Sequence, residues 1–367
     1  MSLKERIRTA AWRAGFQRCG VSRVDTPQHA AFVRRWLANG NAAAMAYIER
    51  GLAKRLDPRL LLPEIRSLIS LAHPYLPPPL PPIDWRAEMR GRIAAYAFAT
   101  DYHLTVKRKL RELAAHISAL RSDAIVRPYV DSAPVLEREW AASGGIGWFG
   151  KNTNILHTQD GSYFFLAELL TNLDLEPDPP VTNRCGTCSR CLDQCPTQAL
   201  TRGYLLDARL CVAFLTIEHR GVIPAELRPQ MGSWIFGCDV CQEVCPWNEK
   251  LVRRNGTPDR EALVPYLPDI LLLDEPGFRS RFRHSAIRRA QRDGFLRNVT
   301  VALGNTRNPS AVGPLRHVLH HDSSPLVRSH AAWALGAIGN HAALQALESV
   351  RRSETNDDVL REIEAAL

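Results

Sequence analysis

The sequence predicts a chain in three parts: an α/β domain over residues 1–173, a ferredoxin-like domain over 174–275, and an all-α unit of HEAT-like repeats over 276–367. In the first part, short apolar runs alternate with amphipathic helical patterns. Eight of the nine cysteines lie in the second part, and a motif ending in Leu-Gly occurs twice in the third. A chain of 367 residues is long enough to build two or three such domains, each with its own core.

The composition is basic, with 47 lysines and arginines against 38 acidic residues and a formal net charge of +9. This balance favours a polyanionic partner. Met1 to Arg18 alternates basic and apolar side chains without the apolar stretch of a secretion signal, and no apolar run is long enough to cross a bilayer. We therefore expect a cytoplasmic monomer with no contact to a membrane, and Cys19 as a small buried residue.

The first part reads as alternating helices and strands. Helices are expected over 3–18, around 32–37 and over 110–120, strands over 67–72, 92–99 and 124–130, and a hairpin between 154–158 and 162–168. Asp101 follows the second of these strands and Asp131 the third. Because ligands bind beyond the carboxyl ends of strands in open α/β sheets, both acids are candidates for a binding or catalytic site. Pro134 fits the first turn of a helix that continues through Trp140.

A glycine-rich segment follows this predicted helix. Gly145, Gly150 and Lys151 fit the first part of a phosphate-binding loop. Asn152 stands where a magnesium-binding hydroxyl is required, however, and a helix rather than a strand precedes the segment, so nucleotide hydrolysis is rejected. We expect the glycines to let the backbone turn tightly or approach a large flat ligand.

The cysteine pattern is the most specific feature of the sequence. The run Cys185-x-x-Cys188-x-x-Cys191-x-x-x-Cys195-Pro196 has the spacing of a bacterial ferredoxin, in which the fourth cysteine reaches to a second [4Fe–4S] cluster. A second run ends in Cys245-Pro246 but has Ile235 in place of its first cysteine, and Cys211 is the obvious substitute. The predicted ligands are Cys185, Cys188, Cys191 and Cys245 for one cluster, and Cys195, Cys211, Cys238 and Cys241 for the other.

Two other interpretations of these cysteines stand beside the clusters. Disulfides are disfavoured in a chain without a secretion signal. Two zinc sites of four cysteines each fit the ligand count, but zinc modules usually pair two Cys-x-x-Cys knuckles and need no third close cysteine followed by proline. Two [4Fe–4S] clusters fit the spacing better, and their visible absorbance distinguishes them from colourless zinc.

The third part combines a repeat with a one-sided charge. Leu303-Gly304 and Leu335-Gly336 lie 32 residues apart in similar surroundings, a period typical of HEAT-type helical repeats. Between Pro276 and Thr300 there are seven arginines, no lysine and one acid, Asp293. A charge run is more often a solvated helical face, but arginine alone shifts the interpretation toward phosphate binding. We expect the repeats to bind an extended partner, with a packing cap as the alternative.

Two clusters beside an α/β domain indicate one-electron transfer toward a substrate site, which favours an enzyme over an electron carrier. Asp131 is the candidate proton donor. A helix N-terminus would lower its pKa, so a donor role requires burial or electron-rich density that raises the pKa. The alternative for Asp131 is a helix cap. Asp101 and His103 are open between catalysis and a hydrogen-bonded loop.

Several motifs together resemble the epoxyqueuosine reductase family, over the whole length of the chain. They are Lys54-Arg55-x-x-Pro58-x-Leu60-Leu61-Leu62-Pro63, Asp101-Tyr102-His103, Val130-Asp131-Ser132, Gly145-Ile146-Gly147, Lys151-Asn152, Gly161-Ser162-Tyr163, the eight cysteines and the HEAT-like tail. The cysteine set alone is shared with reductive dehalogenases. The sequence departs from some relatives at Ala133-Pro134 and Trp148-Phe149, which bears on the shape of the pocket.

The resemblance implies an oxidoreductase that converts epoxyqueuosine to queuosine at the wobble position of tRNA. Electrons from an external low-potential donor would pass through the two clusters to base-off cobalamin, giving cob(I)alamin, and Asp131 would donate the proton. Asp101 and His103 match residues near the substrate. The implied cobalamin contacts are Arg55, Asp131, Lys151, Thr153, Ile155, Leu166 and Ala213. The implied tRNA contacts are Arg138, Arg220, Arg279, Arg281, Arg283, Arg288 and Arg289.

Three rival functions are kept. A cobalamin-dependent reductive dehalogenase would use the same cofactors on a small organohalide, but its usual twin-arginine leader is missing here. A ferredoxin-type electron carrier would bind no corrinoid. A zinc-containing nucleic-acid-binding module would hold zinc in place of iron.

Overall fold

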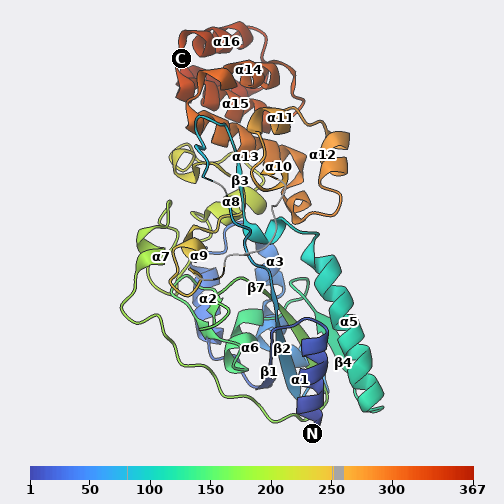
Figure 1. Ribbon diagram of the computed structural model, residues 1–367. Helices are drawn as coiled ribbons and strands as arrows, with labels where there is room; N and C mark the ends of the chain where they lie inside the picture. Colours follow the sequence, from blue (N-terminus) through green and yellow to red (C-terminus); the bar gives the residue numbers. More distant parts are fainter. Residues whose placement is uncertain (81, 250, 252–259) are drawn as a thin grey trace. The chain divides into compact units, whose positions relative to one another are not determined.

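The computed structural model describes residues 1–80, 82–249, 251 and 260–367 (Figure 1). The chain forms two compact units. The first consists of Met1–Pro77, Ala99–Arg209 and Val240–Arg253, and the second of Pro78–Phe98, Leu210–Asp239 and Arg254–Leu367. The predicted ferredoxin-like segment contributes residues to both units, and the domain boundaries after 173 and 275 stay a prediction. None of the described helices is long and apolar enough to cross a membrane.

A four-stranded sheet forms the centre of the first unit, in the order β1-β2-β7-β4. Its strands are β1 (Arg18–Arg23), β2 (Ser67–Pro74), β4 (Val126–Tyr129) and β7 (Phe164–Thr171). All three neighbouring pairs are antiparallel. Helices on both faces of the sheet confirm the α/β class. The expectation that ligands bind beyond the carboxyl ends of parallel strands does not apply, because β7 lies between β2 and β4 and runs antiparallel to both.

Helices cover the two faces of this sheet (Figure 1). On one face, α1 (Leu3–Arg13) and α5 (Tyr102–Leu120) form an apolar core with Ile69 and Leu169. On the other face, Trp140 of α6 (Glu137–Ser143) packs against Leu68 and Leu170. The amphipathic pattern of α5 therefore buries its apolar stripe, as the sequence predicted.

Two polar residues lie on the α6 face of the sheet. Ser70 of β2 and Glu168 of β7 are paired in register, two residues along from the pair Leu68 and Leu170. Since side chains alternate between the faces of a strand, both point to the same face as those leucines. Both are fully buried, so this apolar face contains a hydroxyl and a carboxyl group away from solvent.

Several predicted elements differ in the structure. The first helix ends at Arg13, because Gly15 at φ 88° terminates it, and the following residues form β1, which was not predicted. Pro134 lies outside α6, whose N-cap is Leu136. The predicted hairpin is only a turn closed by hydrogen bonds between His157 and Gly161. The reason is that β6 (Ile155–Leu156) pairs with β5 (Trp148–Phe149) instead of β7.

The predicted strand over 92–99 belongs to the second unit and is mostly not a strand. β3 covers only Arg92–Ile93, paired in parallel with β8 (Trp234–Phe236), and a short 3-10 helix follows over Ala95–Ala97. The backbone N–H of Ala95 donates to the carboxylate of Asp239 at 2.6 Å and so is not available for strand pairing.

The remaining helices complete the two units. The first unit also contains α2 (Ala30–Ala38), α3 (Ala46–Arg50), α4 (Leu52–Leu56), α7 (Arg190–Asp193) and α9 (Val240–Glu243). The second contains α8 (Val212–Ile217), α10 (Arg260–Leu263), α11 (Leu267–Leu271), α12 (Glu275–Arg281), α13 (Gln291–Thr306), α14 (Val312–His321), α15 (Pro325–Ile338), α16 (His341–Arg351) and α17 (Asp357–Ala366).

The repeated Leu-Gly motif marks equivalent helix contacts in the second unit. A Cβ added to Gly304 of α13 would come within 2.8 Å of the Cα of Ala334 in α15. A Cβ added to Gly336 of α15 would come within 2.6 Å of the Cβ of Ala366 in α17. In both places the missing side chain allows two helix backbones to approach closely, which explains why the motif recurs in stacked helical repeats.

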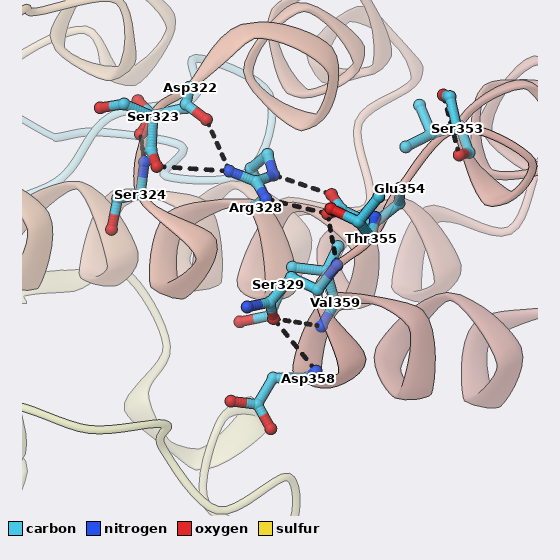
Figure 2. Close-up of polar contacts among 12 residues, drawn as sticks. Asp322, Ser323, Ser324, Arg328, Ser329, Ser353, Glu354, Thr355, Asp358 and Val359 are labelled. Atoms are coloured by element: carbon cyan, nitrogen blue, oxygen red, sulfur yellow. Dashed lines mark hydrogen bonds and ion pairs between the residues drawn. The ribbon is translucent and has the colours of Figure 1, made fainter.

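Arg328 of α15 connects three segments of these repeats (Figure 2). Its guanidinium donates two hydrogen bonds to the carboxylate of Glu354, at 2.8 and 2.9 Å, and one to the carbonyl of Asp322 at 2.9 Å. Glu354 also accepts from the backbone N–H of Thr355 and Asn356. Asn356 in turn caps α17. The ion pair is largely buried, with side chains 16% and 5% exposed.

We predict that Arg328→Ala lowers the free energy of unfolding of this region by roughly 2–3 kcal/mol, because Glu354 is left as a buried carboxylate without its cation. The hydrogen bond from Arg328 is the largest cause that holds the pKa of Glu354 below its ordinary value. The stabilisation is therefore full above the ordinary glutamate pKa and is lost as the pH falls through the lowered pKa of the folded state.

Hydrogen exchange of peptides from 312–367 measures this loss locally. The matched control is Arg361→Ala, which removes an exposed ion pair with Asp358 and should cost about 0–0.5 kcal/mol. Equal protection in the Arg328→Ala and control proteins would show that the buried pair does not stabilise the repeats.

Candidate functional site

The loop after β4 holds Asp131 in an unusual backbone conformation. Asp131 has φ 48°, and the N–H of Ser132 donates to the carbonyl of Val130 at 2.5 Å, which closes a three-residue γ-turn. The N–H of Asp131 donates to Glu137 Oε1 at 2.6 Å. Because α6 starts only after Leu136, Asp131 is not a helix cap, and that alternative from the sequence is excluded. Its side chain is 57% exposed.

The start of α5 supplies the partners of the Asp131 carboxylate. The hydroxyl of Tyr102 donates to Asp131 Oδ2, and His103 Nε2 lies 3.6 Å from the same oxygen. Asp101 caps α5 by accepting from the N–H of His103 at 2.9 Å, and its Oδ1 lies 2.8 Å from His103 Nδ1. The Tyr102 ring stacks on Phe165 at 4.1 Å. The structure thus brings Asp101, His103 and Asp131 together, as the sequence suggested.

The electrostatics of this cluster favour an ionised Asp131. Burial acts to raise its pKa, but hydrogen bonds from His103 and Tyr102 outweigh burial, so the pKa lies below its ordinary value. The hydrogen bond with Asp131 is the largest cause that raises the pKa of His103. Burial acts to lower this pKa, and the hydrogen bond with Asp101 raises it further. The upward pKa shift that a donor role of Asp131 requires is therefore not supplied by the described neighbours.

Two further carboxyl groups, which the sequence analysis did not single out, lie next to Asp131. Burial and then the charge of Asp131 raise the pKa of Glu137 to about 7. Burial and then the charge of Glu137 raise the pKa of Glu168 well above its ordinary value. The signal in the sequence was Glu168 itself, a lone acid within the apolar strand Phe164–Thr171.

Residues predicted to contact cobalamin lie in several environments. Arg55 of α4 donates to the carbonyl of Val135 at 3.1 Å, in the loop of Asp131. Thr153 has φ 66°, and its carbonyl accepts from Arg138 at 3.2 Å. Ile155 of β6 is buried, and Leu166 packs against the same apolar cluster. Ala213 belongs to the second unit.

Lys151, also predicted to contact cobalamin, is engaged by the cysteine loop. Its amino group donates to the carbonyls of Gly186 and Cys188, each at 2.8 Å. This side chain therefore connects the glycine-rich segment to the first predicted cluster run.

The four predicted ligands of the first cluster all belong to the first unit, and this ligand set stays a prediction. Burial raises the pKa of Cys191 to about 11, and the charges of Cys245, Cys185 and Cys188 raise it further in that order. Cys185 and Cys245 pack on one apolar cluster with Trp148. A raised pKa favours the thiol form of Cys191, while a thiolate is the form that binds a metal ion.

The predicted ligands of the second cluster are divided. Cys195 and Cys241 belong to the first unit, and Cys211 and Cys238 to the second, so this ligand set stays a prediction. Cys19, expected as a small buried residue, is half-buried and packs against the apolar core of the first unit, and burial raises the pKa of its thiol to about 12.

Comparison with known proteins decides the family. Family models match residues 55–132 (epoxyqueuosine reductase QueG, DUF1730), 184–248 (4Fe-4S double cluster binding domain) and 282–367 (HEAT repeats). An epoxyqueuosine reductase of Xanthomonas campestris is 42% identical over 341 residues, which cover 91% of this chain and 96% of the relative. One of Pseudomonas aeruginosa is 41% identical, with coverage of 91% and 94%.

The chain belongs to the epoxyqueuosine reductase family. A crystal structure of an epoxyqueuosine reductase with an epoxyqueuosine-modified tRNA-Tyr stem loop is similar at a TM-score of 0.92 and 32% identity, covering 99% of this chain and 97% of that one. The Bacillus subtilis epoxyqueuosine reductase, with its catalytic aspartate loop swung out of the active site, has a TM-score of 0.91 and 32% identity, with coverage of 99% and 98%.

The family confirms the coarse predictions: an α/β domain, a double [4Fe–4S] domain and C-terminal HEAT repeats. An epoxyqueuosine reductase is an oxidoreductase, so the rival classes of dehalogenase, electron carrier and zinc module do not apply to this chain.

The arginine-rich segment is less uniform than its sequence suggests. Arg297 is fully buried, and its guanidinium donates to the carbonyls of Leu215, His219 and Gly221. Arg292 is paired with the nearly buried Asp322. Two of the seven arginines therefore stabilise the fold.

The predicted tRNA contacts in this segment, Arg279, Arg281, Arg283, Arg288 and Arg289, are all exposed. Arg279 is paired with Glu275, and Arg289 with Glu218. Arg220 donates to the carbonyls of Ile217, Arg289 and Ala290, so it orders the segment that carries Arg289.

We predict that Asp131→Asn lowers the pKa of His103, because the hydrogen bond with Asp131 is the largest cause of its rise. The measurement is an NMR titration of the His103 ring. The matched control, Asp101→Asn, should lower the pKa of His103 less, and asparagine still caps α5. An unchanged His103 titration in Asp131→Asn would contradict the site geometry.

Proposed function

We propose that this protein reduces epoxyqueuosine in tRNA to queuosine, with Asp131 as the residue that protonates the departing oxygen. The observation that supports this most directly is the cluster of Asp131, His103 and Tyr102 at the edge of the sheet, in a chain of the epoxyqueuosine reductase family. The Bacillus subtilis relative has a catalytic aspartate on a loop that moves out of its active site. Asp131 likewise sits on a strained loop rather than on a helix or strand.

The reaction sets a requirement for protons. Converting an epoxide to an alkene and water consumes two electrons and two protons. Asp131 would give one proton to the oxygen as its bond to carbon breaks. His103 and Tyr102 would hold the carboxyl group in place, because both contact the same oxygen, Oδ2. The raised pKa of His103 favours its protonated, positively charged form, which would also stabilise the Asp131 carboxylate left after proton transfer.

Cobalamin is a proposed cofactor, implied by the family resemblance. Arg55 Nε is buried and has no hydrogen-bond partner among the described residues. A spare N–H next to the Asp131 loop fits the amide-bearing rim of a corrin. When bound, reduced cobalamin would supply electrons to the substrate carbon. Its proposed contacts are Arg55, Asp131, Lys151, Thr153, Ile155, Leu166 and Ala213.

The proposed route of electrons uses both clusters. An external low-potential donor would reduce the cluster held by Cys185, Cys188, Cys191 and Cys245 and the cluster held by Cys195, Cys211, Cys238 and Cys241. Lys151 would support the first of these by holding the carbonyls of its loop. The electron donor, the monomeric state and the cytoplasmic location stay predictions.

The proposed partner is tRNA that carries epoxyqueuosine. A relative at 32% identity was crystallised with such a stem loop. The proposed phosphate contacts are Arg138, Arg220, Arg279, Arg281, Arg283, Arg288 and Arg289. The exposure of Arg279 fits this role, since an exposed arginine with one carboxylate partner keeps N–H groups for phosphate.

The experiment that tests the function is anaerobic incubation with an epoxyqueuosine stem loop, cobalamin and a strong reductant, with nucleosides identified by mass spectrometry. We expect queuosine from the wild-type protein. Asp131→Asn should lower the rate at least about 100-fold, because general acid catalysis is lost. Iron and corrinoid content of the variant, measured in parallel, should stay at the wild-type level. Wild-type turnover by the variant would remove Asp131 from the mechanism.

The arginine segment generates a second prediction. Replacing Arg279, Arg281, Arg283, Arg288 and Arg289 with alanine should weaken binding of the stem loop. It should also reduce the slope of log affinity against log salt by about 0.7–0.9 for each phosphate that is no longer neutralised by an arginine. The control is Arg108→Ala with Arg121→Ala, two exposed and paired arginines of the first unit. An unchanged salt slope in the five-arginine variant would place the tRNA surface elsewhere.

A further inference from the structure

Glu168 is a buried acid with no cation or N–H donor beside its carboxyl group among the described residues. Its side chain is fully buried in the central strand β7, and neither carboxylate oxygen accepts a hydrogen bond from an N–H or O–H of the described residues. A buried, unpaired carboxylate costs several kcal/mol, so the group is stable there only in its neutral, protonated form. A leucine, as at Leu166 or Leu170 on the same face, would fill the position without this cost.

Among the residues that the structure describes, the groups that face Glu168 carry no positive charge. From β2 the facing residue is Ser70, whose buried hydroxyl is also without a partner among the described residues, and from β4 it is Tyr129. From α6 the facing group is the carboxyl of Glu137, and the charge of Asp131 also acts on Glu168. Arg138 and His103 act on the two nearer carboxyl groups: Arg138 on both Glu137 and Asp131, and His103 on Asp131.

Glu168, Glu137 and Asp131 are linked one to the next, from the core to the active site. Glu168 and Glu137 are within hydrogen-bonding reach of each other. Because ionised carboxylates only accept hydrogen bonds, such a contact requires a proton between the two groups. Glu137 Oε1 accepts from the backbone N–H of Asp131 at 2.6 Å, which fixes this carboxyl at the catalytic loop. Asp131, at 57% exposure, forms the solvent end of the series.

The reaction consumes two protons, and Glu137 and Glu168 hold a proton that could supply one of them. Asp131 can deliver only one of the two protons that leave in the water molecule, and its neighbours favour its ionised form. While Asp131 is exposed it can be protonated by solvent, but a bound nucleoside that contacts it restricts that supply. A second proton stored inside the protein removes this restriction.

We propose that Glu137 and Glu168 share a proton that reloads Asp131 during turnover, which makes them a second proton source of the active site. Asp131 gives its proton to the departing oxygen and becomes a carboxylate. The shared proton then moves from Glu137 to Asp131, directly or through one water, and the charge of the glutamate pair goes from one negative to two. Asp131 passes this second proton to the oxygen, which leaves as water. The two electrons come from the external low-potential donor. After product leaves, solvent returns two protons, one to the glutamate pair through Asp131 and one to Asp131 itself. The inference rests on the proposed function and deepens it.

Glu168→Gln tests the proposal, because glutamine has nearly the same shape but its amide group can neither store nor release a proton. The first measurement is the infrared C=O stretch of a protonated carboxyl group at neutral pH, which needs neither substrate nor cofactor turnover. We expect the band in the wild-type protein and its loss in Glu168→Gln. The matched control is Glu139→Gln, a buried glutamate of the same helix as Glu137 that is paired with His29 instead. Absence of the band from the wild-type protein would overturn the proposal.

The second measurement is the single-turnover rate with the stem loop across pH. We expect Glu168→Gln to slow this step by about 10–100-fold. The decline of the rate with rising pH should also begin at a lower pH than in the wild-type protein, since Asp131 then depends on solvent for its second proton. Glu137→Gln should cause the same loss, and the double variant no more than either, because the pair acts as one unit. Glu139→Gln should keep the wild-type rate and pH profile.

Rates and pH profiles of Glu168→Gln that equal those of the wild-type protein would reject the proton source while leaving the proposed function intact. Failure of the wild-type protein to form queuosine would instead reject the proposed function, and the infrared band alone would then decide whether the pair holds a proton.

Discussion

The hydrogen bond from the backbone N–H of Asp131 to Glu137 is the interaction on which the active-site side of the first unit depends. It turns the chain back on itself directly after β4, at a φ that a non-glycine residue adopts only at a cost. As a result, the Asp131 carboxylate meets Tyr102 and His103 at the start of α5, while its backbone is bound to the half-buried Glu137 at the start of α6. One residue thus connects a strand end and two helices.

In the second unit, buried arginines stabilise the fold by binding backbone carbonyls and carboxylates. Arg297 is surrounded by backbone carbonyls, and burial lowers its pKa to about 9. Arg328 connects helices through one buried carboxylate. Only the arginines that remain exposed, such as Arg281 and Arg283, are available to a polyanion. The basic surface is therefore smaller than the formal charge suggests, and the buried guanidiniums fix the segments that carry it.

The sequence predicted features that depend on local spacing and missed those that depend on pairing. The cysteine spacing, the amphipathic α5 and the Leu-Gly period are local, and each led to a correct assignment of domain type. The strand β1 was missed because its residues do not alternate strongly. The segment 92–99 was misassigned because the N–H of Ala95 bonds to the distant side chain of Asp239, where the pairing of β3 ends. Asp131 was identified from its motif, but Glu168 faces Glu137 only because β7 pairs between β2 and β4, a register that no local pattern contains.

Lys151 has a consequence for how the protein matures. Its ammonium group bridges the carbonyls of Gly186 and Cys188 through hydrogen bonds that involve only the polypeptide. In many small metalloproteins the ligand loop is shapeless until metal arrives, and metal binding supplies the folding energy. Here the Lys151 ammonium group orders the ligand loop before a metal binds. We therefore expect insertion of the iron–sulfur cluster to require little rearrangement of the polypeptide.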